Sequence, residues 1–272
     1  MHADPRLRNA LLHGRRRRGV PGAGAPHPRR ADGYEFAEVR EYVAGDDPRR
    51  IDWAATARAR TLQTRVMYED HALLLAGALD ASQSMFVGRT RSQYAIARTA
   101  LETWYALASH DDRCVRICST SVVSDARRRG HGAAMLCAQA EEPPGATFVS
   151  TLMVAAAATP RDASLLIVSD FHDLDGVTPL VRALAARCDL TALVVRDPWF
   201  DGLPLAGFVR MRDAETGEVR RMWIGAAERA RFRRAVSARE RIAVATLERL
   251  GARCAVLADD PAQALAQAFG LA

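Results

Sequence analysis

Short apolar runs recur along the chain from residue 72 onward. They have the length of strands and mostly lack polar alternation, as strands covered on both faces do, and they lie at residues 72–79, 114–118, 164–168, 190–195 and 254–257. Stretches with helical character separate or follow them, at about residues 91–109, 131–140, 149–158, 177–187, 226–250 and 261–269. This alternation predicts an α/β fold: a doubly wound, mostly parallel sheet with helices on both faces.

Residues 207–224 break this rhythm. Apolar and polar residues alternate here on both sides of Glu215, Thr216, Gly217 and Glu218, which is the pattern of two strands joined by a turn. We therefore predict a β-hairpin inserted near 205–224, ahead of the long helix. We expect it to extend or cover an edge of the sheet.

The net charge of +6 is concentrated at the N-terminus. Residues 1–30 contain eight arginines against one acid, so the rest of the chain is close to neutral. Leu7, Leu11 and Leu12 could form a weak amphipathic turn or two, but residues 14–33 are rich in Arg, Gly and Pro and can bury little apolar surface. We predict a flexible arm over 1–32. It is either a solvated tail or a segment that docks on an acidic partner or an anionic surface through arginines 15–18.

The sequence favours a cytoplasmic location. The longest apolar stretch, residues 72–79, is far shorter than the ~20 residues that span a bilayer. The N-terminal arginines are not followed by the apolar segment of a signal peptide. The cysteines lack Cys-x-x-Cys or zinc-type spacing, so we predict buried free thiols in a reducing compartment at Cys114, Cys118, Cys137, Cys188 and Cys254.

A set of oxygen-bearing side chains follows the predicted strands. Asp80, Ser82 and Ser84 come directly after the first buried strand, and their alternation would bring them within reach of one centre. Thr147 precedes a helix and Asp170 follows the strand at 164–169. Carboxylates and hydroxyls at the carboxyl ends of parallel strands suit a hard cation, Mg²⁺ or Mn²⁺. If the hydroxyls bind directly and the aspartates act through water, the metal can accept a carboxylate from another molecule.

A second motif lies upstream, at residues 35–58. Gly45, Asp46, Asp47 and Pro48 predict a turn, and the charged side chains around it can satisfy one another in an ion network beside Trp53. The members of this network are Arg40, Asp46, Asp47, Arg49, Arg50 and Asp52. Either it is a self-contained surface turn, or these residues and Trp53 form a recognition surface for a partner.

These two motifs carry a family resemblance. Asp80, Ser82, Ser84, Thr147 and Asp170 resemble the metal-ion-dependent adhesion site of von Willebrand factor A domains, and residues 72–272 resemble that family in the order of their elements. The segment 34–58 is similar to the signature F-x-x-x-R-x-Y-x-x-G-D-D-x-R-x-I-D-W of the bacterial "domain of unknown function 58" family. Members of that family carry a von Willebrand A domain after this signature.

The resemblance implies an organisation and a function. Residues 33–71 would form a small β or irregular segment packed on the von Willebrand A-like domain of 72–272. Family members are typically encoded with a MoxR-type AAA+ ATPase and are thought to be its adaptors in maturing or assembling protein complexes. The implied function is a non-enzymatic one, the metal-dependent binding of a protein that donates an acidic residue to the metal.

Two other functions remain as alternatives. His172 lies between Asp170 and Asp173, so a metal-assisted phosphohydrolase would have a base at hand, but no Gly-rich phosphate loop accompanies them. The N-terminal arginines and the arginine-rich helix around residues 229–234 could bind nucleic acid, although the nearly neutral body argues against a wide phosphate-tracking face.

Overall fold

The computed structural model describes most of the chain. The described residues are 5–17, 35–43, 46–68, 73–88, 90–142, 145–161, 163–200, 206–212 and 217–271. The chain divides into two compact units, one formed by residues 1–20 together with 73–272 and the other by residues 21–72.

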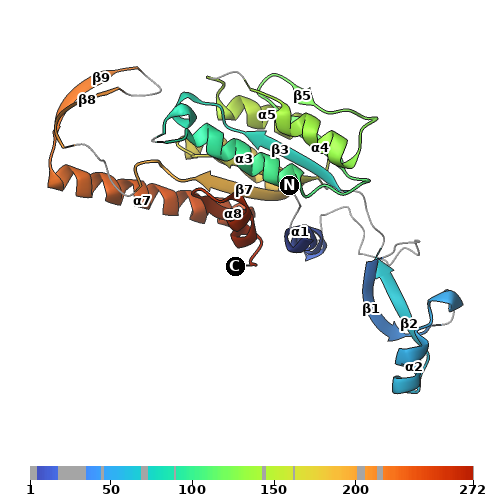
Figure 1. The fold of residues 1–272 in the computed structure, drawn as a ribbon. Coiled ribbons are helices and arrows are strands. Elements are labelled where there is room, and N and C mark those ends of the chain that lie inside the picture. The colour runs from blue at the N-terminus through green and yellow to red at the C-terminus, as the bar shows by residue number, and fades with distance from the viewer. Residues whose placement is uncertain are drawn as a thin grey trace. The chain divides into compact units, whose positions relative to one another are not determined.

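In the larger unit, strands and helices alternate as the apolar pattern predicts (Figure 1). The strands are β3 (Leu74–Leu79), β4 (Arg113–Ile117), β5 (Val122–Val123), β6 (Ser164–Ser169), β7 (Asp189–Val195), β8 (Gly207–Arg212), β9 (Val219–Ile224) and β10 (Arg253–Leu257). The helices are α1 (Pro5–Arg17), α3 (Gln93–Tyr105), α4 (Gly130–Gln139), α5 (Phe148–Ala158), α6 (Leu174–Ala185), α7 (Ala226–Arg249) and α8 (Pro261–Ala268), with a short 3-10 turn η2 (Gln83–Phe86).

The central sheet has the strand order β10-β7-β6-β3-β4-β5, and every strand in it is parallel to its neighbours except β5. The chain leaves β3 through α3 on one face and leaves the neighbouring strand β6 through α6 on the other face. A crevice opens at the carboxyl ends of neighbouring strands whose connections diverge in this way. The predicted doubly wound, mostly parallel fold is therefore confirmed, and its switch point lies between β3 and β6.

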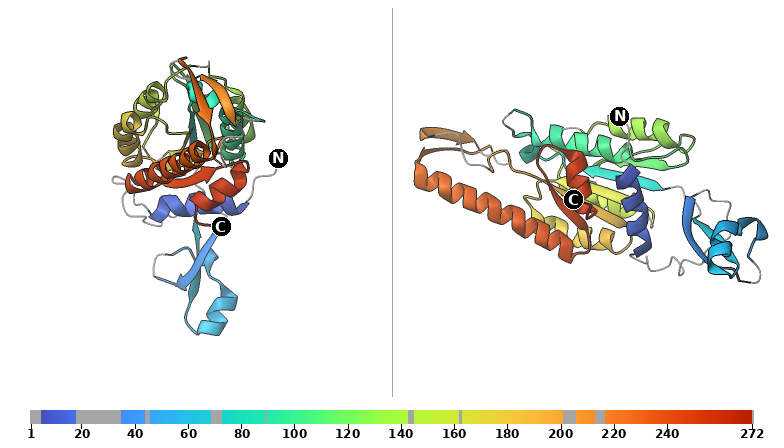
Figure 2. Two further views of the ribbon diagram at one scale, coloured as in Figure 1. Left: turned by 90° about the vertical axis from the view of Figure 1, so that its left-hand side faces the viewer. Right: turned by 60° about the horizontal axis from the view of Figure 1, so that its bottom comes forward.

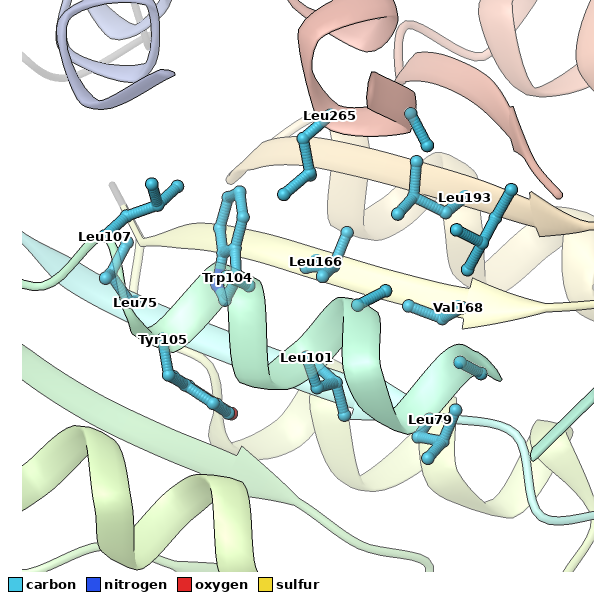
Figure 3. Packing of buried hydrophobic residues seen from close by; sticks show 14 of the residues in the cluster. Leu75, Leu79, Leu101, Trp104, Tyr105, Leu107, Leu166, Val168, Leu193 and Leu265 are labelled. Carbon is cyan, nitrogen blue, oxygen red and sulfur yellow. The ribbon is translucent and has the colours of Figure 1, made fainter. Parts of the chain in front are cut away.

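Helices cover both faces of this sheet (Figures 1 and 2). One apolar core lies under α1, α3, α4 and α8, and the other lies under α5, α6 and α7. Figure 3 shows Leu101 and Trp104 of α3 packed over β3, β6 and β7. Gly77 allows this close approach, because a Cβ atom there would lie 2.6 Å from the side chains of Leu101 and Tyr105.

The N-terminal segment differs from the flexible arm predicted over 1–32. Residues 5–17 form α1, whose Leu7 and Leu11 are fully buried in the core shared with α3 and α8. Arg8 anchors the helix further: its guanidinium lies 2.5 Å from the buried carboxylate of Asp112 and also donates to the carbonyl of Leu107. The isolated segment has only a weak tendency to form a helix. Burial of the two leucines and this ion pair stabilise the helix in the folded protein. Residues 1–4 and 18–32, the rest of the predicted arm, lie outside the described residues.

The hairpin prediction is confirmed, but the expected role at the sheet edge is wrong. Within the described residues, β8 and β9 pair antiparallel with each other and form a separate two-stranded sheet. The hairpin projects beyond the carboxyl ends of the central strands, next to the start of α7 (Figures 1 and 2). Its exposed large side chains include Phe208 and Trp223, so it covers no strand of the central sheet.

The smaller unit holds the second sequence motif. β1 (Glu35–Glu41) pairs antiparallel with β2 (Gln63–Tyr68), and a 3-10 turn η1 (Pro48–Arg50) and a helix α2 (Trp53–Ala59) connect them. This is the predicted small β segment, and its packing on the main domain stays a prediction. Among the described helices of both units, none is long and apolar enough to cross a membrane.

Candidate metal centre

All five residues predicted to form a metal site line one pocket at the carboxyl end of the sheet. Asp80 follows β3, Asp170 follows β6, and Thr147 begins α5, while Ser82 and Ser84 belong to the loop after β3. The pocket thus occupies the crevice at the switch point between the two strands. The sheet brings together oxygen-bearing side chains that lie far apart in the sequence.

Asp80 is buried, and each of its carboxylate oxygens accepts a hydrogen bond. One carboxylate oxygen accepts the backbone N–H of Ser82 at 2.8 Å, and the other accepts the hydroxyl of Ser169 at 2.6 Å. Burial raises the pKa of Asp80 from 3.8 to about 6, although the bonds from Ser169 and Ser82 lower it; the charge of Asp170 raises it further. The site therefore holds a carboxylate whose negative charge is incompletely compensated.

Ser82 and Ser84 approach each other through a turn, not through the strand-like alternation that the sequence suggested. Ser82 precedes the 3-10 turn η2, whose tighter winding brings the two hydroxyl oxygens to 3.1 Å. Octahedral Mg²⁺ binds oxygen at 2.0–2.1 Å, so adjacent ligands lie about 3 Å apart. The two hydroxyls already have the spacing of neighbouring ligands of such an ion.

Thr147 enters the pocket as the N-cap of α5, where its hydroxyl accepts the backbone N–H of Ser150. Gly145, two residues earlier, fixes this loop against the Asp80 loop by donating its N–H to the carbonyl of Ala81 at 2.8 Å. Gly145 has a φ of +94°, which strongly favours glycine over residues with a Cβ. The glycine-led loop seen in the sequence therefore holds Thr147 beside the other donors.

Asp170 is nearly buried and is followed by a strained residue. Phe171 has a φ of +50°, which is uncommon for a bulky side chain. Its ring packs edge-on against Phe148, and its N–H donates to the hydroxyl of Ser169 at 2.8 Å. Packing and this bond hold the chain in a turn that aims Asp170 into the pocket.

Ser169 also lines this pocket, and the sequence analysis did not predict it. Its hydroxyl connects Asp80 with the backbone of Phe171, so it links the ends of β3 and β6. Its position follows from strand register: Leu79 pairs with Val168, and the next residue on each strand is Asp80 and Ser169. Only the knowledge that β3 and β6 are neighbours could have identified it.

His172 lies exposed at the rim of the same pocket. Arg239 of α7 donates to its Nδ1 at 3.0 Å and to the carboxylate of Asp197 at 2.9 Å. Because the guanidinium can only donate, Nδ1 of His172 is the acceptor in this contact. The contact ties α7 to the pocket.

The residues predicted as a partner surface all lie in the smaller unit. Arg40 pairs with Asp46 at 2.8 Å, as the ion network predicts. Asp47 caps η1 and Asp52 caps α2, and Asp52 also pairs with Arg65, which the sequence analysis did not select. Arg49 and Arg50 lie within η1, and Trp53 is 68% exposed. A role of this surface in binding stays a prediction.

Comparison with known proteins identifies the family. Residues 38–242 match the family described as "Protein of unknown function DUF58". The chain belongs to this family. It is also 31% identical, over 256 residues, to uncharacterised proteins of Mycobacterium bovis and Mycobacterium tuberculosis; the match covers 90% of this chain and 78% of each relative. The DUF58 chain thus shares most of its length with proteins whose function is unassigned.

Solved structures similar to this DUF58 chain are distant in sequence. One is the conserved hypothetical protein BatB from Bacteroides thetaiotaomicron, with 16% identity and a TM-score of 0.38 over 66% of this chain and 98% of that one. Another is a von Willebrand factor type A protein from Catenulispora acidiphila, with 10% identity and a TM-score of 0.36 over 77% of this chain and 43% of that one.

Proposed function

We propose that this DUF58 protein binds a divalent cation, Mg²⁺ or Mn²⁺, at the pocket of Asp80 and Asp170, and uses it to bind an acidic side chain of a protein partner. The observation that carries the proposal is the pair of hydroxyl oxygens of Ser82 and Ser84. They lie 3.1 Å apart, at the spacing of adjacent ligands of an octahedral ion, beside a buried carboxylate.

The donor set favours binding over hydrolysis. Ser82, Ser84 and Thr147 would be direct ligands, and Asp80, whose two carboxylate oxygens are already engaged, would act mainly through water and through Ser82. Neutral direct ligands leave most of the positive charge on a bound ion, which then supplies a centre for a further carboxylate oxygen. The partner's Asp or Glu would be that ligand.

A second part of the proposal concerns the partner. We infer, from the family to which the chain belongs, that the partner system includes a MoxR-type AAA+ ATPase and that the protein is its adaptor in the maturation or assembly of a protein complex. This proposed function is non-enzymatic. We expect the chain to co-purify with a MoxR-type ATPase in Mg²⁺ but not in EDTA; equal recovery under both conditions would contradict a metal-dependent contact.

Isothermal titration with Mg²⁺ tests the metal site itself. We expect one site per chain in the parent protein, and loss of binding in Asp80→Ala and in Ser84→Ala. Ser121→Ala is the matched control, because Ser121 is exposed and does not line the pocket. Absence of Mg²⁺ and Mn²⁺ binding by the folded parent protein would refute the proposal.

A further inference from the structure

A basic surface of the larger unit is formed by the projecting hairpin and the first turns of α7. We call the described residues 206–212 and 217–234 the basic arm. In sequence, residues 206–234 carry eight arginines against four acids. Four of the arginines lie on the strands, Arg210, Arg212, Arg220 and Arg221, and the other four lie between residues 229 and 234; all eight are exposed.

The charge of this arm is largely uncompensated within the described part of the chain. Of the two described acids, Glu218 pairs with Arg220, and Glu228 accepts the N–H of Gly225 at the start of α7. Arg210 and Arg221 make no ion pair with a described residue, yet they stand directly opposite each other across the two strands. Like charges in that position destabilise a hairpin, so a bound anion would stabilise it.

One face of the hairpin combines these charges with aromatic rings. Side chains alternate between faces along a strand, so Phe208 and Arg210 share a face with their cross-strand partners Trp223 and Arg221. The two rings pack edge-to-face with centroids 5.0 Å apart, yet Phe208 is 86% exposed and Trp223 is 57% exposed. Exposed aromatic side chains next to arginines are the residue types that dominate the energetics of protein interfaces.

This face belongs to the same end of the molecule as the metal pocket. The hairpin follows β7 and projects beyond the carboxyl ends of the strands (Figure 1). α7 continues from the arm to Arg239, whose guanidinium contacts His172 at the pocket rim at 3.0 Å. Arg234 and Arg239 are five residues apart, which is about 8 Å along a helix. The arm and the pocket can therefore contact one partner.

We propose that the basic arm is a docking surface for an acidic protein segment, rich in Asp and Glu, of the partner whose carboxylate reaches the metal pocket. The proposal rests on the proposed function for the shared partner. The carboxylates of such a segment would accept bidentate hydrogen bonds from the guanidinium groups of Arg210 and Arg221. Apolar side chains of the same segment would cover Phe208 and Trp223. Nucleic acid is the competing anion, and the test separates the two.

Fluorescence anisotropy of the full chain with a labelled poly-glutamate peptide tests this proposal, with a thymidine oligonucleotide of equal charge in parallel. We expect the peptide to bind more tightly than the oligonucleotide. Arg210→Glu combined with Arg221→Glu should weaken peptide binding by about tenfold or more, because two attractive contacts become repulsive. Phe208→Ala should weaken it less, at a site too exposed to affect folding.

Arg127→Glu combined with Arg161→Glu is the matched control. It makes the same change of charge at exposed residues near the amino ends of the strands, and should leave binding unchanged. Absence of peptide binding, tighter binding of the oligonucleotide, or equal weakening by the control pair would overturn the arm proposal. If the folded protein binds neither Mg²⁺ nor Mn²⁺ while the arm variant still weakens peptide binding, the proposed metal function fails and the arm proposal stands.

Discussion

Replacing Asp80 by Asn should stabilise the metal-free protein. Asp80 is 3% exposed, and burial raises its pKa from 3.8 to about 6. The folded protein therefore binds the Asp80 proton more tightly than the unfolded chain does, so protonated Asp80 favours the folded state. This stabilisation is fully present below pH 3.8 and is lost as the pH rises through about 6. At neutral pH the ionised carboxylate costs the folded state up to about 3 kcal/mol.

Asparagine removes this cost while keeping the shape of the side chain. Its carbonyl oxygen can still accept the N–H of Ser82, and its amide can donate to the hydroxyl of Ser169, which reverses the direction of that bond. We therefore expect Asp80→Asn to raise the free energy of unfolding by one to about 3 kcal/mol at pH 8. At pH 4 the difference should be small.

Urea unfolding in EDTA, followed by circular dichroism between pH 4 and pH 8, measures this difference. Asp259→Asn serves as the control, because that carboxylate is exposed and the change should alter stability little at any pH. Added Mg²⁺ should stabilise the parent protein and leave Asp80→Asn unaffected. A variant that is less stable than the parent at pH 8, or a difference that does not depend on pH, would refute the view that Asp80 is held in an unfavourable ionised state.

Two further predictions concern the packing of the larger unit. Leu11→Ala should lower the free energy of unfolding by about 2–5 kcal/mol, since Leu11 is fully buried in the core shared with α3 and α8. The control Leu271→Ala, at an exposed residue, should change it by less than about 0.5 kcal/mol. Equal unfolding midpoints for Leu11→Ala and the parent protein would show that α1 does not dock. Burial raises the pKa of Cys114 to about 12 and that of Cys137 to about 11. Alkylation of these thiols at pH 8 should therefore be slow in the folded protein and rapid in urea, and rapid modification of either residue in the folded state would contradict their burial.

Several features of the fold could be predicted because they depend on neighbours in sequence. Uninterrupted apolar runs such as residues 164–168 must be buried on both faces, which requires helices between the strands and parallel pairing. The same reasoning located Asp80 and Asp170, because a polar residue that follows a buried strand must lie at the end of the sheet. The hairpin at 207–224 was equally visible, since its alternation and its turn are local.

The sequence alone could not determine which strand ends meet. Ser169 lies in the site only because β6 is the neighbour of β3. Ser82 approaches Ser84 through a 3-10 turn, which the strand-like alternation of these residues in the sequence did not predict. The docking of α1 likewise required a partner surface, because a short helix with two leucines gains its stability from the core it joins. Local pattern thus determined the elements and most of the candidate ligands. The tertiary structure decided their contacts, because contact free energies depend on residues that are distant in the chain.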